Sequence, residues 1–278
     1  MACFLVCTLF GFIGDSIVWA ANEEGGRKRT VQYAQAPSGV WFVPNAGHCP
    51  SDVQASARVN GGDLWLNRTG WQVAMLGAGY DALGRHESPS GPLVTHVLDV
   101  EWEGCSLDAT FDGSAAPAAH QVSYYRGQDP SKWAEGIRPT GKYTVRDVWP
   151  GIDAVLDGQR GDAALIKSDW HVAPGADPAQ ISVRYRGLDS RLQPDGTIRH
   201  LIGAAVGEGE SVTGAWGHVA EAAPFAYQIR GTRLEEVPCH YVLTPDEDGG
   251  SHLTFQVGDY DPLRPLIIDP EIEFASFV

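Results

Sequence analysis

The chain has 278 residues, which is enough for one large or two ordinary domains with a substantial hydrophobic core. Hydrophobic residues make up 43% of it, and this content excludes wholesale disorder. The formal net charge of −15 argues against nucleic acid as a partner, because phosphate binding needs clustered Lys and Arg.

The N-terminal segment is typical of a secretory signal peptide. Residues 3–13 are almost wholly apolar, and residues 17–21 end in small side chains. This pattern predicts cleavage between Ala20 and Ala21 and therefore a signal peptide over residues 1–20. The segment is short and contains Asp15, so it does not match a span of about 30 Å of bilayer. Since no basic residue precedes the apolar run, an uncleaved anchor remains one alternative, and a buried N-terminal strand or helix is another. We expect an extracytoplasmic protein, secreted or on the cell surface, with no membrane span after cleavage.

Residues 21–38 are polar and lack periodicity, which predicts a linker. From Gly39 onward, apolar and polar residues alternate with a period of two. The alternating runs are 71–75, 98–102, 181–186 and 253–257. Such alternation places one face of a strand on a core and the other in water, as in antiparallel sheets.

Turn signals separate these runs. The chain holds 33 Gly and 18 Pro, and Gly-rich turns recur at 60–62, 158–161, 194–196 and 248–250. Pro194-Asp195-Gly196 predicts a hairpin between the residues on either side of it. Helix is scarce, with one start at Asp129-Pro130 that Gly136 ends after about two turns.

The predicted fold class is all-β: an antiparallel β-sandwich or two packed β lobes, with little helix. We expect the β-rich domain to span residues 39–278. The small-residue tract at 112–119 is either a surface loop or a seam between two lobes, and the sequence does not choose between them.

Removal of the signal peptide would leave three cysteines. They are Cys49, Cys105 and Cys239, at wide spacing and without a Cys-x-x-Cys pair. This pattern is equally compatible with two alternatives. In the first, two cysteines form a disulfide and the third is a buried thiol; in the second, all three are buried thiols. No His lies at ligand spacing from these cysteines, so we expect no zinc site.

Aspartates follow two Pro-Gly turns closely. The simpler interpretation is that Asp153 and Asp177 cap backbone N–H groups in these turns. The alternative is a calcium site formed by Asp153, Asp157 and Asp177, with Asp162 and Asp169 nearby, because calcium takes six to eight oxygen ligands. Calcium is the one cofactor that the sequence suggests, although no EF-hand or nonapeptide spacing is present.

A further acidic group flanks residues 265–268, which we predict to form a fully buried strand. Asp259, Asp261 and Asp269 surround this run, and we expect Arg264 to pair with one of them. Glu101 and Glu103 would lie about 7 Å apart on one strand face. A solvated face is the better interpretation of these two glutamates than a glycosidase pair.

The sequence contains no nucleophile elbow, zinc-protease helix or phosphate loop, so we assign no catalytic or cofactor-binding residue. Tryptophans offer a competing hypothesis, in which exposed rings form a platform for sugars while most of the others lie in the core. The candidates are Trp65, Trp71, Trp133, Trp149, Trp170 and Trp216.

Four motifs together resemble a known type of domain. They are FVPNAGH at 42–48, YYRGQDPSKW at 124–133, VWPGID with VAPGADP at 148–153 and 172–178, and YDPLRPLIIDP at 260–270. In this order they resemble the N-terminal β-rich domain of bacterial secreted proteins that carry SBBP-type β-propeller repeats. Residues 165–171 depart from the acidic-aromatic strand common there.

The resemblance implies a non-catalytic extracytoplasmic module that supports or presents neighbouring domains of a larger surface protein, and it implies no catalytic residues. The alternative is a carbohydrate-binding or carbohydrate-active β-sandwich module, for which a glycan would be the partner.

Overall fold

The computed structural model describes residues 39–59, 62–76, 95–125, 128–159, 166–202, 217–247, 249–270 and 272–277. The expected signal peptide and linker lie outside these residues, so their prediction stands as a prediction. The described residues from 39 to 75 and from 96 onward belong to one compact unit.

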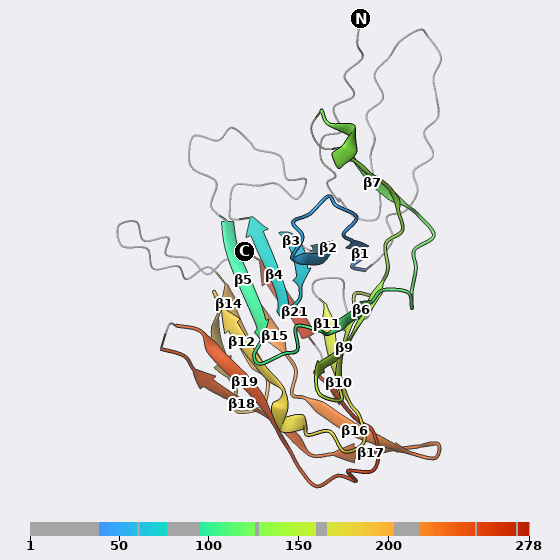
Figure 1. The fold of residues 1–278 in the computed structure, drawn as a ribbon. Coiled ribbons are helices and arrows are strands. Elements are labelled where there is room, and N and C mark those ends of the chain that lie inside the picture. The colour runs from blue at the N-terminus through green and yellow to red at the C-terminus, as the bar shows by residue number, and fades with distance from the viewer. Residues whose placement is uncertain are drawn as a thin grey trace, which may run out of the picture. The chain divides into compact units, whose positions relative to one another are not determined.

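Strands dominate the described part of this unit (Figure 1), and every pairing whose register is known is antiparallel. An eight-stranded sheet has the order β1 (Phe42–Pro44), β2 (Val53–Val59), β3 (Gly62–Asn67), β4 (Gly70–Leu76), β5 (Thr95–Trp102), β12 (Ser182–Arg186), β19 (Ser251–Val257) and β18 (Cys239–Pro245). A seven-stranded sheet has the order β17 (Arg233–Val237), β16 (Phe225–Arg230), β20 (Leu266–Asp269), β11 (Lys167–Val172), β10 (Ile152–Asp157), β9 (Lys142–Trp149) and β6 (Thr110–Asp112).

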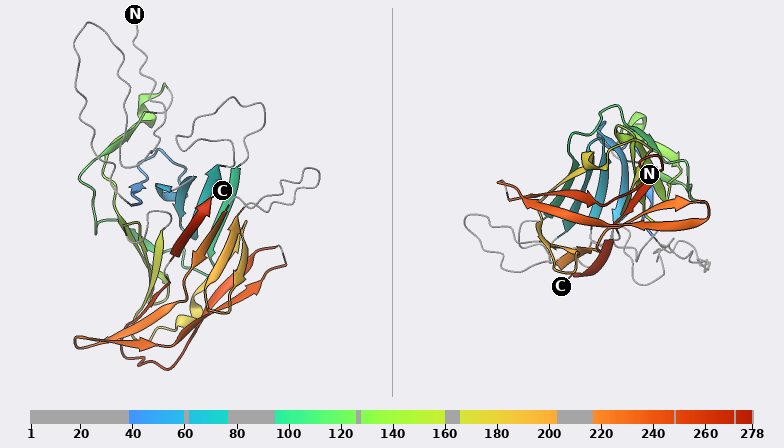
Figure 2. Two further views of the ribbon diagram at one scale, coloured as in Figure 1. Left: turned by 180° about the vertical axis from the view of Figure 1, so that it is seen from behind. Right: turned by 90° about the horizontal axis from the view of Figure 1, so that it is seen from below.

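Two smaller sheets complete the described strands (Figure 2). One contains β13 (Asp189–Leu192), β14 (Ile198–Ile202), β15 (Gly217–Glu221) and β21 (Ile272–Phe277) in that order. The other is a ribbon of β7 (Val122–Tyr124) and β8 (Ala134–Ile137). The sheets are not closed into a barrel. The all-β antiparallel prediction is therefore confirmed.

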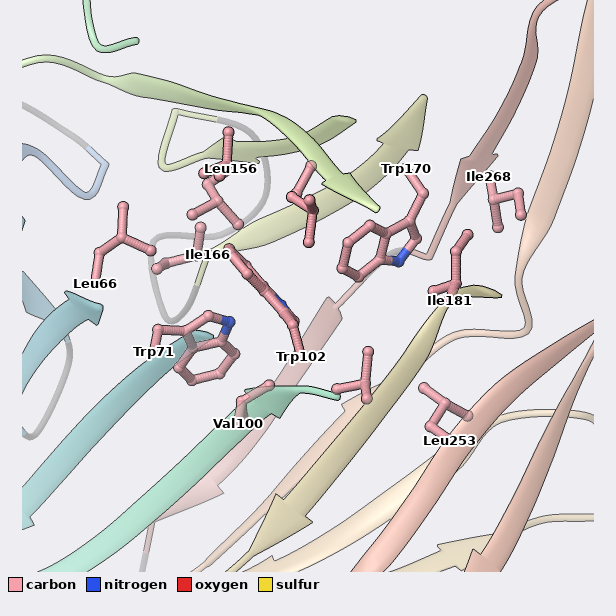
Figure 3. Packing of buried hydrophobic residues seen from close by; sticks show 14 of the residues in the cluster. Leu66, Trp71, Val100, Trp102, Leu156, Ile166, Trp170, Ile181, Leu253 and Ile268 are labelled. Atoms are coloured by element: carbon pink, nitrogen blue, oxygen red, sulfur yellow. The ribbon is translucent and has the colours of Figure 1, made fainter. Parts of the chain in front are cut away.

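The two large sheets share one hydrophobic core, in which Trp102, Trp149 and Trp170 pack together as a group that we call the aromatic centre. Trp102 on β5 meets Trp170 on β11 with ring centroids 6.1 Å apart and planes at 78°. Trp149 on β9 packs against Trp170 at 5.3 Å, and its ring N–H donates to the carbonyl of Glu103 at 2.9 Å. Figure 3 shows Trp102 and Trp170 approaching each other from the two sheets. The same core continues to Ile198 and Val219 in the four-stranded sheet.

The predicted alternation matches burial in the strands. Leu98, Val100 and Trp102 point into the core, while Asp99 and Glu101 between them are partly exposed. The hairpin predicted at Pro194-Asp195-Gly196 is confirmed, since β13 and β14 pair with Leu192 opposite Ile198. Gly196 has φ +86°, which favours glycine, and Asp195 accepts a hydrogen bond from the N–H of Thr197 at 3.0 Å.

Helix is limited to two single 3₁₀ turns among the described residues, η1 (Pro130–Lys132) and η2 (Pro178–Gln180). Asp129 caps η1 as predicted, accepting from the N–H of Ser131 at 3.0 Å. The predicted length of two turns is wrong, because residues from Ala134 onward pair with β7 instead. The Asp177-Pro178 sequence repeats the same cap at η2, which we did not predict as helical.

The strand predicted at 265–268 is β20, which lies between β16 and β11. Leu266 and Ile268 are buried, whereas Ile267 is half-buried opposite Tyr227 and His171. The expectation of a fully buried strand is therefore wrong for one face. Residues 113–119 lie in the connection between β6 and β7, and the two-lobe alternative stays a prediction. None of the helical turns in the described ranges has the length and apolar character that a bilayer crossing requires.

Trp170→Ala should lower the free energy of unfolding by about 3–5 kcal/mol, because it opens a cavity between the two large sheets. Trp133→Ala is the matched control, since this ring is 38% exposed, and should cost about 0.5 kcal/mol or less. Denaturant unfolding of both variants measures the difference. Equal losses would contradict the central place of Trp170.

Candidate functional site

Buried polar side chains concentrate where the four-stranded sheet meets the eight-stranded sheet. Glu221, at the end of β15, is 7% exposed. Its Oε1 accepts a hydrogen bond from the phenol of Tyr185 on β12 at 2.8 Å. His200 on β14 places Nε2 3.1 Å from the same oxygen, and Ser190 on β13 places Oγ 2.8 Å from His200 Nδ1. We call these four residues the Glu221 cluster.

The phenols beside Glu221 are held in their protonated form. Burial raises the pKa of Tyr185 well above its ordinary value, and the charge of the Glu221 carboxylate raises it further. The same causes raise the pKa of Tyr241, which lies on β18, separated from β12 by β19 in the same sheet, and Asp269 adds to them. A phenol that keeps its proton remains a hydrogen-bond donor for a buried carboxylate, which needs such donors.

The Glu221 cluster has the order hydroxyl, imidazole, carboxylate that a proton relay requires. The sequence showed no motif for it, because the three residues come from three different strands. One signal was present: the hairpin at 194–196 fixes a register in which Ser190 lies directly opposite His200. Glu221 follows only from the pairing of β14 with β15.

A second buried group of charges lies on β10, β11 and β20. The Nζ of Lys167 is 2.6 Å from Oδ1 of Asp269 and 3.9 Å from Oδ1 of Asp169. The three side chains are between 7% and 19% exposed. Lys167 also lies opposite Asp157 in the β10–β11 register, and Asp157 has Lys142 at 3.7 Å. Lysine ammonium groups thus neutralise the carboxylates here.

The residues of the calcium hypothesis have separate partners. Asp153 accepts from the N–H of Asp147 at 2.8 Å, and Asp177 accepts from Ala179 at 3.0 Å. Asp157 accepts from Gln159 at 2.9 Å. Asp153 and Asp157 are four residues apart on β10, about 13 Å along a strand.

Within the described ranges no three His, Cys, Asp or Glu side chains gather as a metal site. Both Asp153 and Asp177 accept backbone N–H groups, as the simpler interpretation expected, but neither does so within its Pro-Gly turn. Asp153 accepts from Asp147 of β9, and Asp177 caps η2. Asp162 lies outside the described residues, and calcium binding stays a prediction.

A polar network covers the solvent-facing side of the eight-stranded sheet. Glu103 Oε2 lies 2.7 Å from His252 Nδ1 and accepts from Ser182 at 2.8 Å. His252 Nε2 is 3.5 Å from Asp246, which also pairs with Arg184. Burial acts to raise the pKa of Glu103, but the hydrogen bonds from His252 and Ser182 and the nearby positive charges outweigh it and lower that pKa.

Glu101 and Glu103 have different partners in this network. Glu101 pairs with Arg186 at 2.7 Å, whereas Glu103 contacts His252 and Ser182. Both glutamates are partly exposed on the solvent-facing side of β5 and its C-terminal extension, as the solvated-face interpretation predicted. The predicted pairing of Arg264 is also confirmed, since its Nε lies 3.0 Å from Asp261.

The tryptophans divide between core and surface. Trp71, Trp149 and Trp170 are buried, as expected for most of the candidates, and Trp65 is half-buried. At the surface, Trp133 and Tyr125 form a perpendicular pair with centroids 5.3 Å apart. Tyr125 is 59% exposed and Trp133 38%. Trp216 lies outside the described residues.

Cys49, Cys105 and Cys239 carry free thiols, as the alternative without a disulfide expected, but only Cys239 is buried as that alternative also expected. Burial raises the pKa of Cys239 to about 11, and burial also raises the pKa of Cys105. Cys49 and Cys105 are only partly buried. A thiol that keeps its proton is a poor nucleophile and metal ligand, so Cys239 is a packing residue of β18.

The fold and its buried contacts define an antiparallel all-β protein whose sheets are tied by polar clusters. The chain belongs to the family described as "Domain of unknown function (DUF7948)", whose model matches residues 42–271. No curated protein and no solved structure matches the chain. The match confirms that the chain contains a domain of this uncharacterised kind, whereas the association with SBBP-type repeats stays a prediction.

Glu221→Ala should lower the free energy of unfolding by about 3 kcal/mol, because it leaves Tyr185 and His200 buried without their acceptor. Ser190→Ala is the matched control within the cluster. It removes one hydrogen bond from a half-buried residue and should cost about 1 kcal/mol or less. Thermal and denaturant unfolding compare the two, and a larger loss in Ser190→Ala would refute this role for Glu221.

Proposed function

We propose that this protein is a non-catalytic extracytoplasmic module of a bacterial surface or secreted protein, which supports or presents neighbouring domains. The observation that carries the proposal is that the buried ionisable side chains of Glu221 and Lys167 bind other residues of the protein across strands and sheets. Glu221 binds Tyr185 from one sheet and His200 from another, and Lys167 joins β11 to β20. The first of these contacts joins two sheets and the second joins two strands of one sheet, and a supporting module requires such ties.

The proposed location has support from the sequence. The apolar run at 3–13 followed by small residues up to Ala21 fits export. The net charge of −15 fits solubility outside a cell. The resemblance to domains that precede SBBP-type repeats adds a context in which such a module stands beside others.

The Glu221 cluster is where an enzymatic interpretation is most easily tested. Its hydroxyl, imidazole and carboxylate stand in relay order, but Glu221 accepts from Tyr185 at the same oxygen that faces His200. That second bond anchors the carboxylate to β12. We therefore interpret the cluster as a tie between sheets, and Ser190 as a partner of His200 rather than a nucleophile.

Hydrolysis of p-nitrophenyl acetate tests this interpretation directly. Wild type and Ser190→Ala should show the same slow rate, because no step depends on the hydroxyl of Ser190. Unfolding curves recorded on both proteins establish that the variant is folded. A drop of about tenfold or more in the folded variant, equal to about 1.4 kcal/mol of lost transition-state stabilisation, would overturn the non-catalytic proposal.

A second candidate function is glycan binding, which the exposed pair of Tyr125 and Trp133 favours. Two rings at 87° present faces of different orientation at the surface of the β7–β8 ribbon. Aromatic faces offer rigid apolar area at small entropic cost, which suits the C–H faces of sugar rings. Ser123 and Glu135 are exposed polar residues on the same ribbon.

A glycan array probed with the wild-type chain and with Trp133→Ala checks this second candidate. Binding that falls at least tenfold in Trp133→Ala would support it. Leu263→Ala is the matched control, because Leu263 is 83% exposed and its side chain is not aromatic. A blank array with the wild type, or equal binding by Trp133→Ala, would count against glycan binding.

A further inference from the structure

The hairpin of β16 and β17 carries an exposed apolar surface at the end of the seven-stranded sheet (Figures 1 and 2). Ile229 and Leu234 lie directly opposite each other on its two strands. They are 58% and 54% exposed. Only residues 225–227 of β16 pair with β20, so the turn end of the hairpin projects beyond that strand. Exposed apolar side chains gathered on a projecting element indicate an interaction surface.

The strand β17 is the end strand of its sheet among the described residues. Its residues Arg233, Leu234, Glu235 and Glu236 are all exposed. Edge strands that are open to solvent carry backbone N–H and C=O groups that another strand can pair with. By comparison, β18 at the edge of the eight-stranded sheet lies against β13.

The turn of the hairpin determines which backbone groups of β17 face outward. Gly231, with φ +62°, and Thr232 form a two-residue turn of the kind that has glycine first. In such a hairpin the flanking residues, Arg230 and Arg233, form a hydrogen-bonded pair, and the pattern alternates from there. The N–H and C=O groups of Leu234 and Glu236 therefore point away from β16.

We propose that β17 pairs edge to edge with β17 of a second copy of this chain, in antiparallel register about a two-fold axis at Leu234. In this register Leu234 of one copy faces Leu234 of the other, and their outward backbone groups meet. Arg233 of each copy faces Glu235 of its partner, which gives two ion pairs. The strand β17 can therefore serve as its own partner, because antiparallel pairing about a two-fold axis is self-complementary.

Charge and apolar area both support a second copy of this chain as the partner of β17. Charged residues on an edge strand commonly keep other strands away. Here the signs of Arg233 and Glu235 are opposite, so a second copy meets attraction on both sides of the axis, and opposite charges across strands are stabilising. The two-fold axis also brings Ile229 and Leu234 of both copies onto one face, where each pair loses exposed apolar surface.

The contact is short, so the dimer is weak and concentration-dependent. Analytical ultracentrifugation of the full chain over the micromolar range should show a rising dimer fraction. Arg233→Glu and Glu235→Arg should each raise the dimer dissociation constant at least about tenfold, because each places two like-charged pairs across the axis. Wild-type chain that stays monomeric at its highest soluble concentration would overturn the proposal.

Mixing the two single variants gives the sharper test. In a mixed pair, the glutamate introduced by Arg233→Glu faces the arginine introduced by Glu235→Arg, and the two native residues at these positions, which also have opposite charge, face each other. Equal amounts of the two variants should therefore form a heterodimer, although each variant is monomeric alone. Recovery on mixing also excludes misfolding as the cause of the losses. Failure to associate on mixing, or dimers of either variant alone as strong as the wild type's, would show that β17 is not the interface.

Discussion

The contact between Trp102 and Trp170 is the constraint on which the rest of the described fold depends. An antiparallel sheet has one apolar face, which must be buried against another layer. The two rings come from the middle of the two large sheets and pack edge to face, with Trp149 against them. Because Trp149 also donates to the Glu103 carbonyl, the aromatic centre fixes the seven-stranded sheet to the C-terminal end of β5. Large aromatic side chains contribute much of the burial that holds such layers together.

Buried hydrogen bonds and ion pairs, which we call polar ties, join strands and sheets in addition to the aromatic centre. Burying a carboxylate is costly unless hydrogen bonds and opposite charges compensate. Glu221 has Tyr185 and His200, and Asp269 has Lys167, so each buried charge meets its partner from a neighbouring strand or sheet. These contacts require particular registers between strands, whereas apolar packing alone tolerates exchange of similar residues. The proposed supporting role follows from this arrangement, in which reactive residue types serve to join sheets.

The sequence predicted what depends on local pattern. Period-two alternation at Leu98, Val100 and Trp102, the hairpin at Pro194-Asp195-Gly196 and the caps by Asp129 and Asp177 are each decided by neighbouring residues. The helix after Asp129 was predicted too long, because pairing with β7 outweighs the local helix signal. The Lys167 and Glu221 contacts join residues far apart along the chain, so no local pattern reveals them. The abundance of aspartate between residues 153 and 177 suggested the calcium site. The positions of Asp153 and Asp157 on β10, four residues apart, instead keep these two carboxylates away from each other.

The central claim is that one core and its polar ties make the β sheets a single cooperative unit. Its most direct test is equilibrium unfolding followed in parallel by tryptophan fluorescence, which reports on the aromatic centre, and by far-ultraviolet circular dichroism, which reports on all sheets. The account predicts coincident transitions with one midpoint and one slope, as for a two-state domain. Separated transitions, with the fluorescence change preceding or following the loss of β structure, would contradict it and favour two β lobes that unfold independently.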